Sequence, residues 1–134
     1  MMKRIFLLGS TGSIGVSTLD VIAQHPDQFR VVALTANQQV ERMYEQCMQF
    51  KPEFAVMVDT SAADQLATRL SKAGHSDITV LSGVDGLEHV ASLDSVQQVM
   101  AAIVGAAGLR PSLAAARSGK RVLLANKESL VLSG

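Results

Sequence analysis

Residues 5–15 read Ile-Phe-Leu-Leu-Gly-Ser-Thr-Gly-Ser-Ile-Gly, an apolar run that leads directly into three glycines spaced three apart. The apolar run predicts a buried strand, and residues 13–24 are compatible with a helix. Glycines at 9, 12 and 15 allow the backbone to turn sharply, to approach a pyrophosphate closely and to pack the helix on its strand. The start of the helix offers unpaired N–H groups and a positive dipole end to an anion. We therefore predict a phosphate-binding turn between this strand and this helix.

The spacing Gly-x-x-Gly-x-x-Gly differs from the more common Gly-x-Gly-x-x-Gly, and a tight turn that binds nothing is the alternative. Three spaced glycines exceed what such a turn requires. The hydroxyls of Ser10, Thr11 and Ser13 are expected to add donors for a phosphate. A P-loop requires Gly-Lys-Ser/Thr at its end, whereas Val16 follows Gly15, which disfavours hydrolysis of a nucleoside triphosphate.

The composition fits one domain over residues 1–134, with 48% apolar and 18% charged residues. Twelve basic residues balance twelve acidic ones, so the net charge favours neither nucleic acid nor a membrane surface as a partner. No apolar run approaches the roughly 18 residues of a membrane helix. The single Cys47 lies among apolar residues at helical spacing, which indicates a buried thiol rather than a nucleophile. We expect a cytoplasmic protein.

Short apolar runs alternate with helical stretches along the chain. The predicted strands are residues 4–8, 30–35, 54–58, 78–81, 96–103 and 121–125. The predicted helices are residues 14–24, 40–50, 62–73, 87–92 and 111–118. Several strands are almost continuously apolar, which is typical of parallel strands covered on both faces. The pattern predicts an α/β, Rossmann-like, doubly wound fold, with a mostly parallel sheet and helices on both faces.

Ligands of such sheets bind beyond the carboxyl ends of the strands. Four loops should therefore converge on one crevice, at residues 9–15, 36–39, 105–108 and 126–129.

The end of the second predicted strand indicates which dinucleotide fits. NAD enzymes carry an acidic residue there that binds the ribose hydroxyls, whereas this strand has no acid before Glu41. The amides of Asn37, Gln38 and Gln39 can donate to a 2′-phosphate, and Arg42 could add a positive charge. These residues favour NADP over NAD. The alternative is that Asn37 or Gln38 only caps the next helix.

A second informative run follows the last predicted strand, as Asn126-Lys127-Glu128-Ser129. Asn126 can cap the next helix, with Glu128 favourable in its first turn. At the mouth of the crevice, Lys127 could also donate to a substrate oxygen, and Asn126 and Glu128 could reach hydroxyl groups.

Three segments together make the chain resemble the 1-deoxy-D-xylulose 5-phosphate reductoisomerase family. They are GSTGSIG at residues 9–15, VMAAIVGAAGL at residues 99–109 and LANKESL at residues 124–130. Their order and spacing match the amino-terminal NADPH-binding domain of that family over essentially the whole chain. Other NADP enzymes, such as aspartate-semialdehyde dehydrogenase, share the first segment but not the third.

The resemblance implies an NADP-dependent oxidoreductase of the non-mevalonate route to isoprenoids. Enzymes of this family rearrange 1-deoxy-D-xylulose 5-phosphate and reduce the resulting aldehyde with NADPH to 2-C-methyl-D-erythritol 4-phosphate. They need Mg²⁺, Mn²⁺ or Co²⁺. The family is dimeric, which implies a homodimer for the full-length protein.

The resemblance also implies functional residues by motif match. Lys127 would contact the deoxyxylulose phosphate, and residues 105–108 would lie near the nicotinamide. The residues implied for NADPH are Thr11, Gly12, Ser13, Ile14, Asn126 and Glu128. Family members often carry Gly-Lys-Asn or Gly-Arg-Asn where this chain has Asn37-Gln38-Gln39. Loss of that cation predicts a reduced preference for NADPH over NADH unless Arg42 compensates.

In the family, the metal is held by an Asp-x-Glu and a further Glu that lie downstream of the position of Gly134. We therefore expect neither a metal ligand nor a catalytic residue in this chain, and we expect the chain alone to be inactive in the rearrangement. Two other interpretations stay open: a domain of a different NADP oxidoreductase, and a non-catalytic dinucleotide-binding module.

Overall fold

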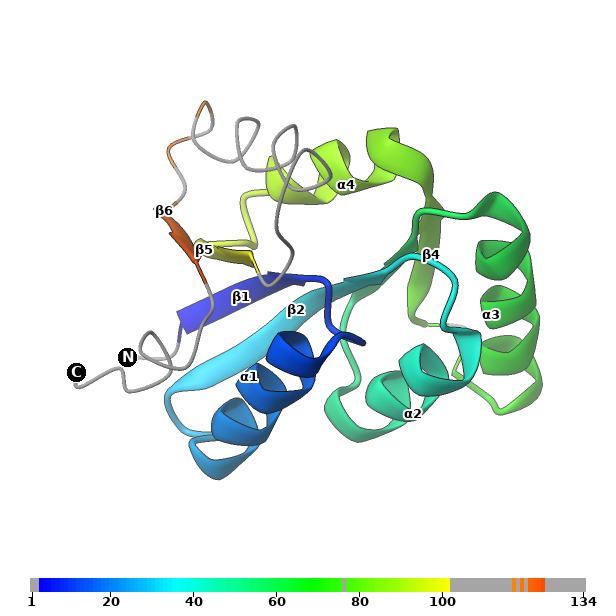
Figure 1. Cartoon of the computed structure of the whole chain (residues 1–134), viewed down its shortest axis with the longest axis horizontal. Helices are drawn as coiled ribbons and strands as arrows, with labels where there is room; N and C mark the ends of the chain where they lie inside the picture. Colours follow the sequence, from blue (N-terminus) through cyan, green and yellow to red (C-terminus); the bar gives the residue numbers. More distant parts are fainter. Residues whose placement is uncertain (1–2, 76, 102–116, 118, 120, 125–134) are drawn as a thin grey trace.

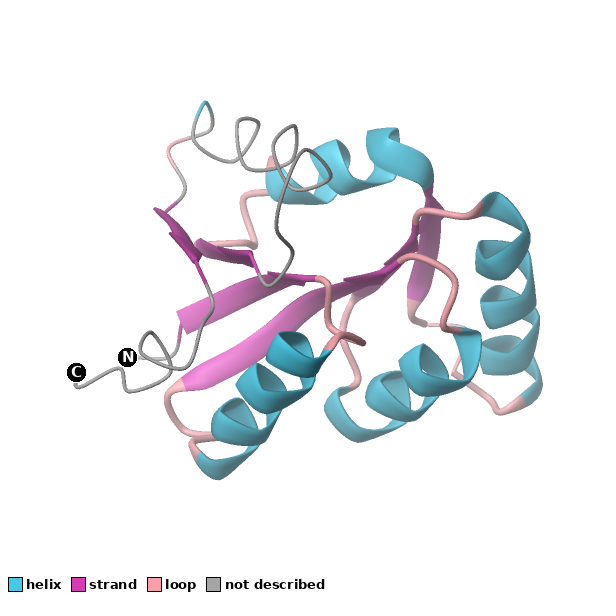
Figure 2. Ribbon diagram, in the orientation of Figure 1, coloured by secondary structure: helices cyan, strands magenta, loops and turns pink. Residues whose placement is uncertain are grey.

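The computed structural model describes residues 3–75, 77–101, 117, 119 and 121–124. Within them the strands are β1 (Lys3–Leu8), β2 (Phe29–Ala36), β3 (Phe54–Met57), β4 (Thr79–Ser82), β5 (Gln98–Ala101) and β6 (Arg121–Leu124). The helices are α1 (Ser13–Gln24), α2 (Val40–Phe50), α3 (Thr60–Lys72) and α4 (Gly83–Ala91). Figure 2 shows strands and helices alternating along the chain.

The strands form one parallel sheet in the order β4-β3-β2-β1-β5-β6. The chain first moves outward from β1 to β4 and then returns to place β5 on the other side of β1. Helices α1, α2 and α3 cover one face of the sheet, and α4 covers the other (Figure 1). The predicted α/β, Rossmann-like, doubly wound fold is confirmed.

Alternating residues of the central strands supply two apolar cores. Ile5 and Leu7 of β1 pack toward α1, α2 and α3, while Phe6 and Leu8 pack toward α4. All four side chains are fully buried, and burial of each contributes about 1.5–3 kcal/mol. A strand that is apolar on both faces appears in the sequence as an unbroken apolar run, which explains the pattern at residues 5–8.

A bulge interrupts the pairing of β1 with β2. Ile5 pairs with Val31 and Phe6 pairs with Ala33, so that Val32 has no partner in β1. Val32 and Ala33 therefore both face the core under α4, although they are adjacent in sequence. The bulge changes which residues of β2 face each core.

Most predicted boundaries differ from the structure by one or two residues, and the starts of two helices have a structural basis. Helix α4 begins at Gly83 rather than at residue 87, and Gly86 in its first turn lies close to the sheet. A Cβ atom at Gly86 would lie 3.1 Å from Cβ of Leu81 and 3.3 Å from Cγ1 of Val56. Helix α3 begins at Thr60, and the Asp59 carboxylate caps it by accepting a 2.9 Å hydrogen bond from the Ala62 N–H.

The predicted helix over residues 111–118 falls almost entirely outside the described residues, as do residues 102–103 of the fifth predicted strand. Among the described helices, none is both long enough and apolar enough to cross a membrane.

Candidate functional site

The segment of residues 9–15, which contains the three spaced glycines and is called the glycine turn below, lies at the carboxyl end of β1, where the strand order reverses. β1 pairs with β2 on one side and with β5 on the other, so the turn stands between the two halves of the sheet. Parallel α/β sheets bind ligands at this position. The turn leads into α1, whose amino terminus points at the same edge of the sheet (Figure 1).

The three glycines of the turn serve different physical purposes. Gly9 has φ 79°, a left-handed conformation that favours glycine. A Cβ atom at Gly15 would lie 2.1 Å from the Gly9 carbonyl oxygen, so glycine is required for α1 to pack on the turn. A Cβ atom at Gly12 would meet only that same oxygen, at 3.8 Å. The fold therefore requires glycine at 9 and 15, while Gly12 leaves open space at the surface of the turn.

Thr35, at the end of β2, holds the first half of the turn. Its hydroxyl oxygen accepts a hydrogen bond from the Gly9 N–H at 3.0 Å, and its carbonyl oxygen accepts one from the Ser10 N–H at 2.8 Å. The Ser10 hydroxyl also donates to this carbonyl, at 3.2 Å, and the Ser10 side chain is fully buried. The prediction that the Ser10 hydroxyl serves a phosphate is therefore wrong, because that hydroxyl is used inside the fold.

Helix α2 holds the second half of the turn. The side-chain Nε2 of Gln46 donates to the Ser10 carbonyl oxygen at 2.8 Å, and Nη1 of Arg42 lies 3.4 Å from the Thr11 carbonyl oxygen. Gln46 is buried with the core residues Met43 and Cys47 on the same side of α2.

Thr35 and Gln46 were not expected from the sequence as site residues. The sequence nevertheless contains a feature at each position that could have indicated its role. Thr35 is a polar residue that directly follows the apolar residues 31–34 of β2. Gln46 is an amide at a helical position three residues after the buried Met43.

The predicted 2′-phosphate residues lie in the loop between β2 and α2. Asn37, Gln38 and Gln39 are exposed there, and the Asn37 carbonyl accepts a 3.1 Å hydrogen bond from the Asp59 N–H. The N-cap of α2 is Gln39, whose side chain makes no capping hydrogen bond. Since α2 is not capped by Asn37 or Gln38, the capping alternative does not account for these amides.

An ion pair and an arginine lie beside this loop. Glu41, the first acidic residue after β2, pairs with Arg69 of α3. Arg69 also lies over the Tyr44 ring, with its guanidinium carbon 4.2 Å from the ring centre. The carboxylate of Glu41 is thus paired with the Arg69 guanidinium of α3, while the Arg42 guanidinium contacts the glycine turn. The structure therefore brings together the cation, the exposed amides and the turn that the sequence indicated separately.

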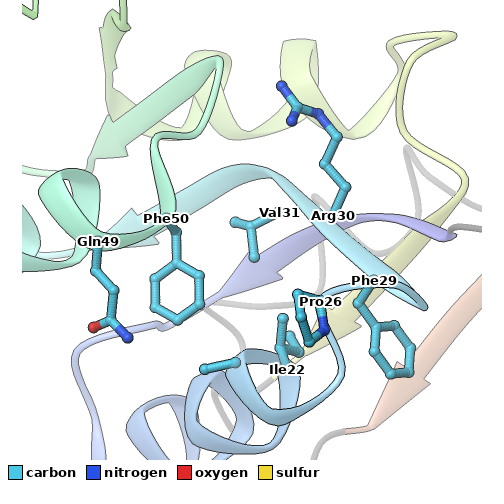
Figure 3. Close-up of a pocket in the computed structure, with 8 residues that line it drawn as sticks. Ile22, Pro26, Phe29, Arg30, Val31, Gln49 and Phe50 are labelled. Atoms are coloured by element: carbon cyan, nitrogen blue, oxygen red, sulfur yellow. The ribbon is translucent and has the colours of Figure 1, made fainter.

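Another hollow on the molecule is distinct from this site. A pocket of about 350 Å³ lies between the carboxyl ends of α1 and α2, beside the start of β2 (Figure 3). Ile22, Phe29 and Phe50 contribute its apolar walls. It lies at the amino ends of the strands, opposite the glycine turn. Open parallel α/β sheets bind dinucleotides beyond the carboxyl ends of their strands, so this pocket is not a candidate for the coenzyme.

Several predicted residues lie outside the described part of the chain: Asn126, Lys127, Glu128 and residues 105–108. Within the residues that the structure describes, no group of three or more His, Cys, Asp or Glu side chains is arranged to hold a metal ion. Cys47 is buried, as predicted, and burial raises the pKa of its thiol to about 12.

Comparison with known proteins identifies relatives of this arrangement. A family model described as 1-deoxy-D-xylulose 5-phosphate reductoisomerase matches residues 5–134. A protein of that name from Nitrosomonas europaea is 61% identical over 132 residues, which are 98% of this chain and 32% of the relative. One from Methylococcus capsulatus is 62% identical over 133 residues, which are 99% of this chain and 34% of the relative. The chain thus spans about a third of the length of these relatives.

Solved structures give the same result. A crystal structure of this reductoisomerase in complex with NADPH, fosmidomycin and magnesium has a TM-score of 0.87 and 46% identity. The match covers 98% of this chain and 32% of that one. The Zymomonas mobilis enzyme in complex with NADPH has a TM-score of 0.84 and 41% identity, covering 99% of this chain and 34% of that one. The glycine turn, the parallel sheet and these matches agree, and the chain belongs to the 1-deoxy-D-xylulose 5-phosphate reductoisomerase family.

Proposed function

We propose that this chain binds NADPH and forms, over residues 1–134, the coenzyme-binding domain of a 1-deoxy-D-xylulose 5-phosphate reductoisomerase. The observation that carries the proposal is the glycine turn at the strand-order reversal, with open space at Gly12. Within the described residues, the Thr11 N–H has no hydrogen-bond acceptor, so this donor is available to a ligand. Relatives whose structures contain NADPH support the same assignment.

The residues of the turn fit a pyrophosphate. We assign Thr11, Gly12, Ser13 and Ile14 to the pyrophosphate. The Thr11 N–H has no acceptor among the described residues, Gly12 leaves open space, and the first N–H groups of α1 lack partners within the helix. We assign Asn37, Gln38 and Gln39, assisted by Arg42, to the 2′-phosphate. By the family motif, Asn126 and Glu128 also contact the coenzyme, Lys127 contacts the substrate and residues 105–108 lie near the nicotinamide.

For the whole protein we propose the reaction of the family. It isomerises 1-deoxy-D-xylulose 5-phosphate and reduces the product to 2-C-methyl-D-erythritol 4-phosphate, with NADPH supplying the hydride and a divalent cation bound by residues beyond Gly134. The described residues of this chain do not fit a metal site, and its own contribution is to bind and orient the coenzyme. We further propose a homodimer in the cytoplasm, with a small-molecule substrate and neither nucleic acid nor membrane as a partner.

Calorimetric titration of the 134-residue chain with NADPH tests the coenzyme assignment. We expect one NADPH per chain and a rise in unfolding temperature as NADPH is added, because a ligand that binds only the folded state stabilises it. The chain alone should show no turnover of 1-deoxy-D-xylulose 5-phosphate with Mg²⁺. Absence of heat at millimolar NADPH would refute the coenzyme assignment, and turnover by this chain would refute its restriction to coenzyme binding.

Substitution of Gln38 by arginine should raise the preference for NADPH over NADH. The introduced guanidinium would add a charge-assisted hydrogen bond to the 2′-phosphate, which NADH lacks, and the expected gain in discrimination is roughly fivefold. The ratio of the two dissociation constants, measured by fluorescence titration, gives the answer. Gln65→Arg adds the same charge to the exposed face of α3 and is the matched control. Equal ratios in the Gln38→Arg variant, the control and the unchanged chain would contradict the assignment of this loop.

A further inference from the structure

Gln46 is an unusual residue for the buried side of a helix. Its side chain is 8% exposed, and its Nε2 donates to the Ser10 carbonyl oxygen at 2.8 Å. Its Oε1 is buried without a hydrogen-bond partner among the described residues. A buried acceptor without a partner costs about 1–3 kcal/mol, which an apolar side chain would avoid. Core packing alone therefore does not explain why a glutamine, rather than an apolar residue, occupies position 46.

The geometry of the Ser10–Thr11 peptide explains the presence of Gln46. This peptide bond is trans, so its carbonyl oxygen and its N–H point in opposite directions. Gln46 holds the Ser10 carbonyl in the buried interior. The Thr11 N–H on the same peptide plane must then point away from Gln46, outward from the core.

The other N–H groups between β1 and α1, those of residues 9, 10 and 12, are already engaged. Those of Gly9 and Ser10 donate to Thr35, and that of Gly12 lies 3.4 Å from the Gly9 carbonyl oxygen. Between β1 and α1, the Thr11 N–H is the donor that has no acceptor among the described residues. Gln46 thus fixes the orientation of the peptide between β1 and α1 whose N–H remains for a ligand, beside the first N–H groups of α1.

We infer that Gln46 is a positioning residue for coenzyme binding: its amide sets the Ser10–Thr11 peptide so that the Thr11 N–H faces the pyrophosphate of NADPH. The inference rests on the proposed function, and it extends the site to a side chain that does not itself touch the coenzyme. A free peptide plane would have to rotate and be ordered when the anion binds, whereas Gln46 orders it beforehand.

Two ligands separate this role from general support of the fold. NADPH contains the pyrophosphate, whereas adenosine 2′-monophosphate carries only the adenine, the ribose and the 2′-phosphate. Gln46→Met keeps the length of the side chain but removes the donor. We expect this variant to bind NADPH roughly tenfold more weakly and to bind adenosine 2′-monophosphate unchanged, because one donor to the pyrophosphate is misplaced and no contact to the 2′-phosphate is changed.

The measurements are calorimetry for NADPH and amide chemical shifts for the nucleotide, with urea unfolding to show that each variant is folded. Gln49→Met, at an exposed position on the same helix, is the matched control and should bind both ligands normally. If the Gln46→Met chain does not fold, Gln46→Leu is used instead, because leucine also lacks a donor and is a good helix former.

The outcomes are distinct. A folded Gln46 variant that binds NADPH as tightly as the unchanged chain, or that loses both ligands to the same degree, overturns the positioning role. An unchanged chain that binds neither ligand overturns the proposed function, and this inference with it. Selective loss of NADPH supports both.

Discussion

Replacement of Gly15 by alanine is expected to destabilise the chain by about 3 kcal/mol or more and to abolish NADPH binding. The added Cβ would lie 2.1 Å from the Gly9 carbonyl oxygen and 2.7 Å from Cα of Ser10. Both neighbours are backbone atoms of the turn, so no flexible side chain can move aside. The clash can be relieved only by lifting the start of α1 from β1, which disrupts the phosphate-binding turn.

Urea unfolding and NADPH titration of the Gly15→Ala chain measure the two effects. Gly12→Ala is the matched control, since its Cβ would approach only the Gly9 carbonyl oxygen, at 3.8 Å. Gly12 is the N-cap of α1, and alanine is a poorer cap than glycine. Since no steric clash is added, we expect this control to lose less than about 1 kcal/mol of stability. It should nevertheless weaken NADPH binding by filling the space in front of the turn. An unchanged unfolding midpoint for Gly15→Ala would contradict the packing argument.

Alkaline solution is expected to weaken the fold through Cys47. Burial raises the pKa of its thiol from 9.0 to about 12, so the folded chain keeps the proton that the unfolded chain loses above pH 9. Burial of the neutral thiol therefore costs the fold nothing extra below pH 9. The free energy of unfolding then falls as the pH rises from 9 toward 12. The slope is at most about 1.4 kcal/mol per pH unit, which makes the total of the order of 4 kcal/mol.

The measurement is the free energy of unfolding in urea between pH 8 and pH 11, for the unchanged chain and for Cys47→Ala. The difference between the two chains isolates the contribution of the Cys47 thiol. The unchanged chain should lose stability more steeply than the variant. Parallel curves would show that the thiol does not govern the alkaline transition.

The turn between β1 and α1 could be predicted because its determinants are adjacent in sequence. An apolar strand, three spaced glycines and a helical run lie within residues 5–24. The strand and helix alternation and the apolar character of residues 5–8 indicated a doubly wound sheet in the same local way. The start of α4 was missed because Gly83 and Gly86 resemble a loop until the packing of Gly86 against Leu81 and Val56 is seen.

Local pattern thus accounts for which elements form, for the class of the fold and for the place of the glycine turn, because each can be read from residues that are close together in sequence. The support of the turn depends on the tertiary structure. Thr35 reaches Gly9 across 26 residues, and Gln46 reaches Ser10 across 36, only because β2 pairs with β1 and α2 packs on the sheet beside α1. The inward direction of the Ser10 hydroxyl was decided at the same level, since no short-range spacing indicates which groups two separate elements will bury between them.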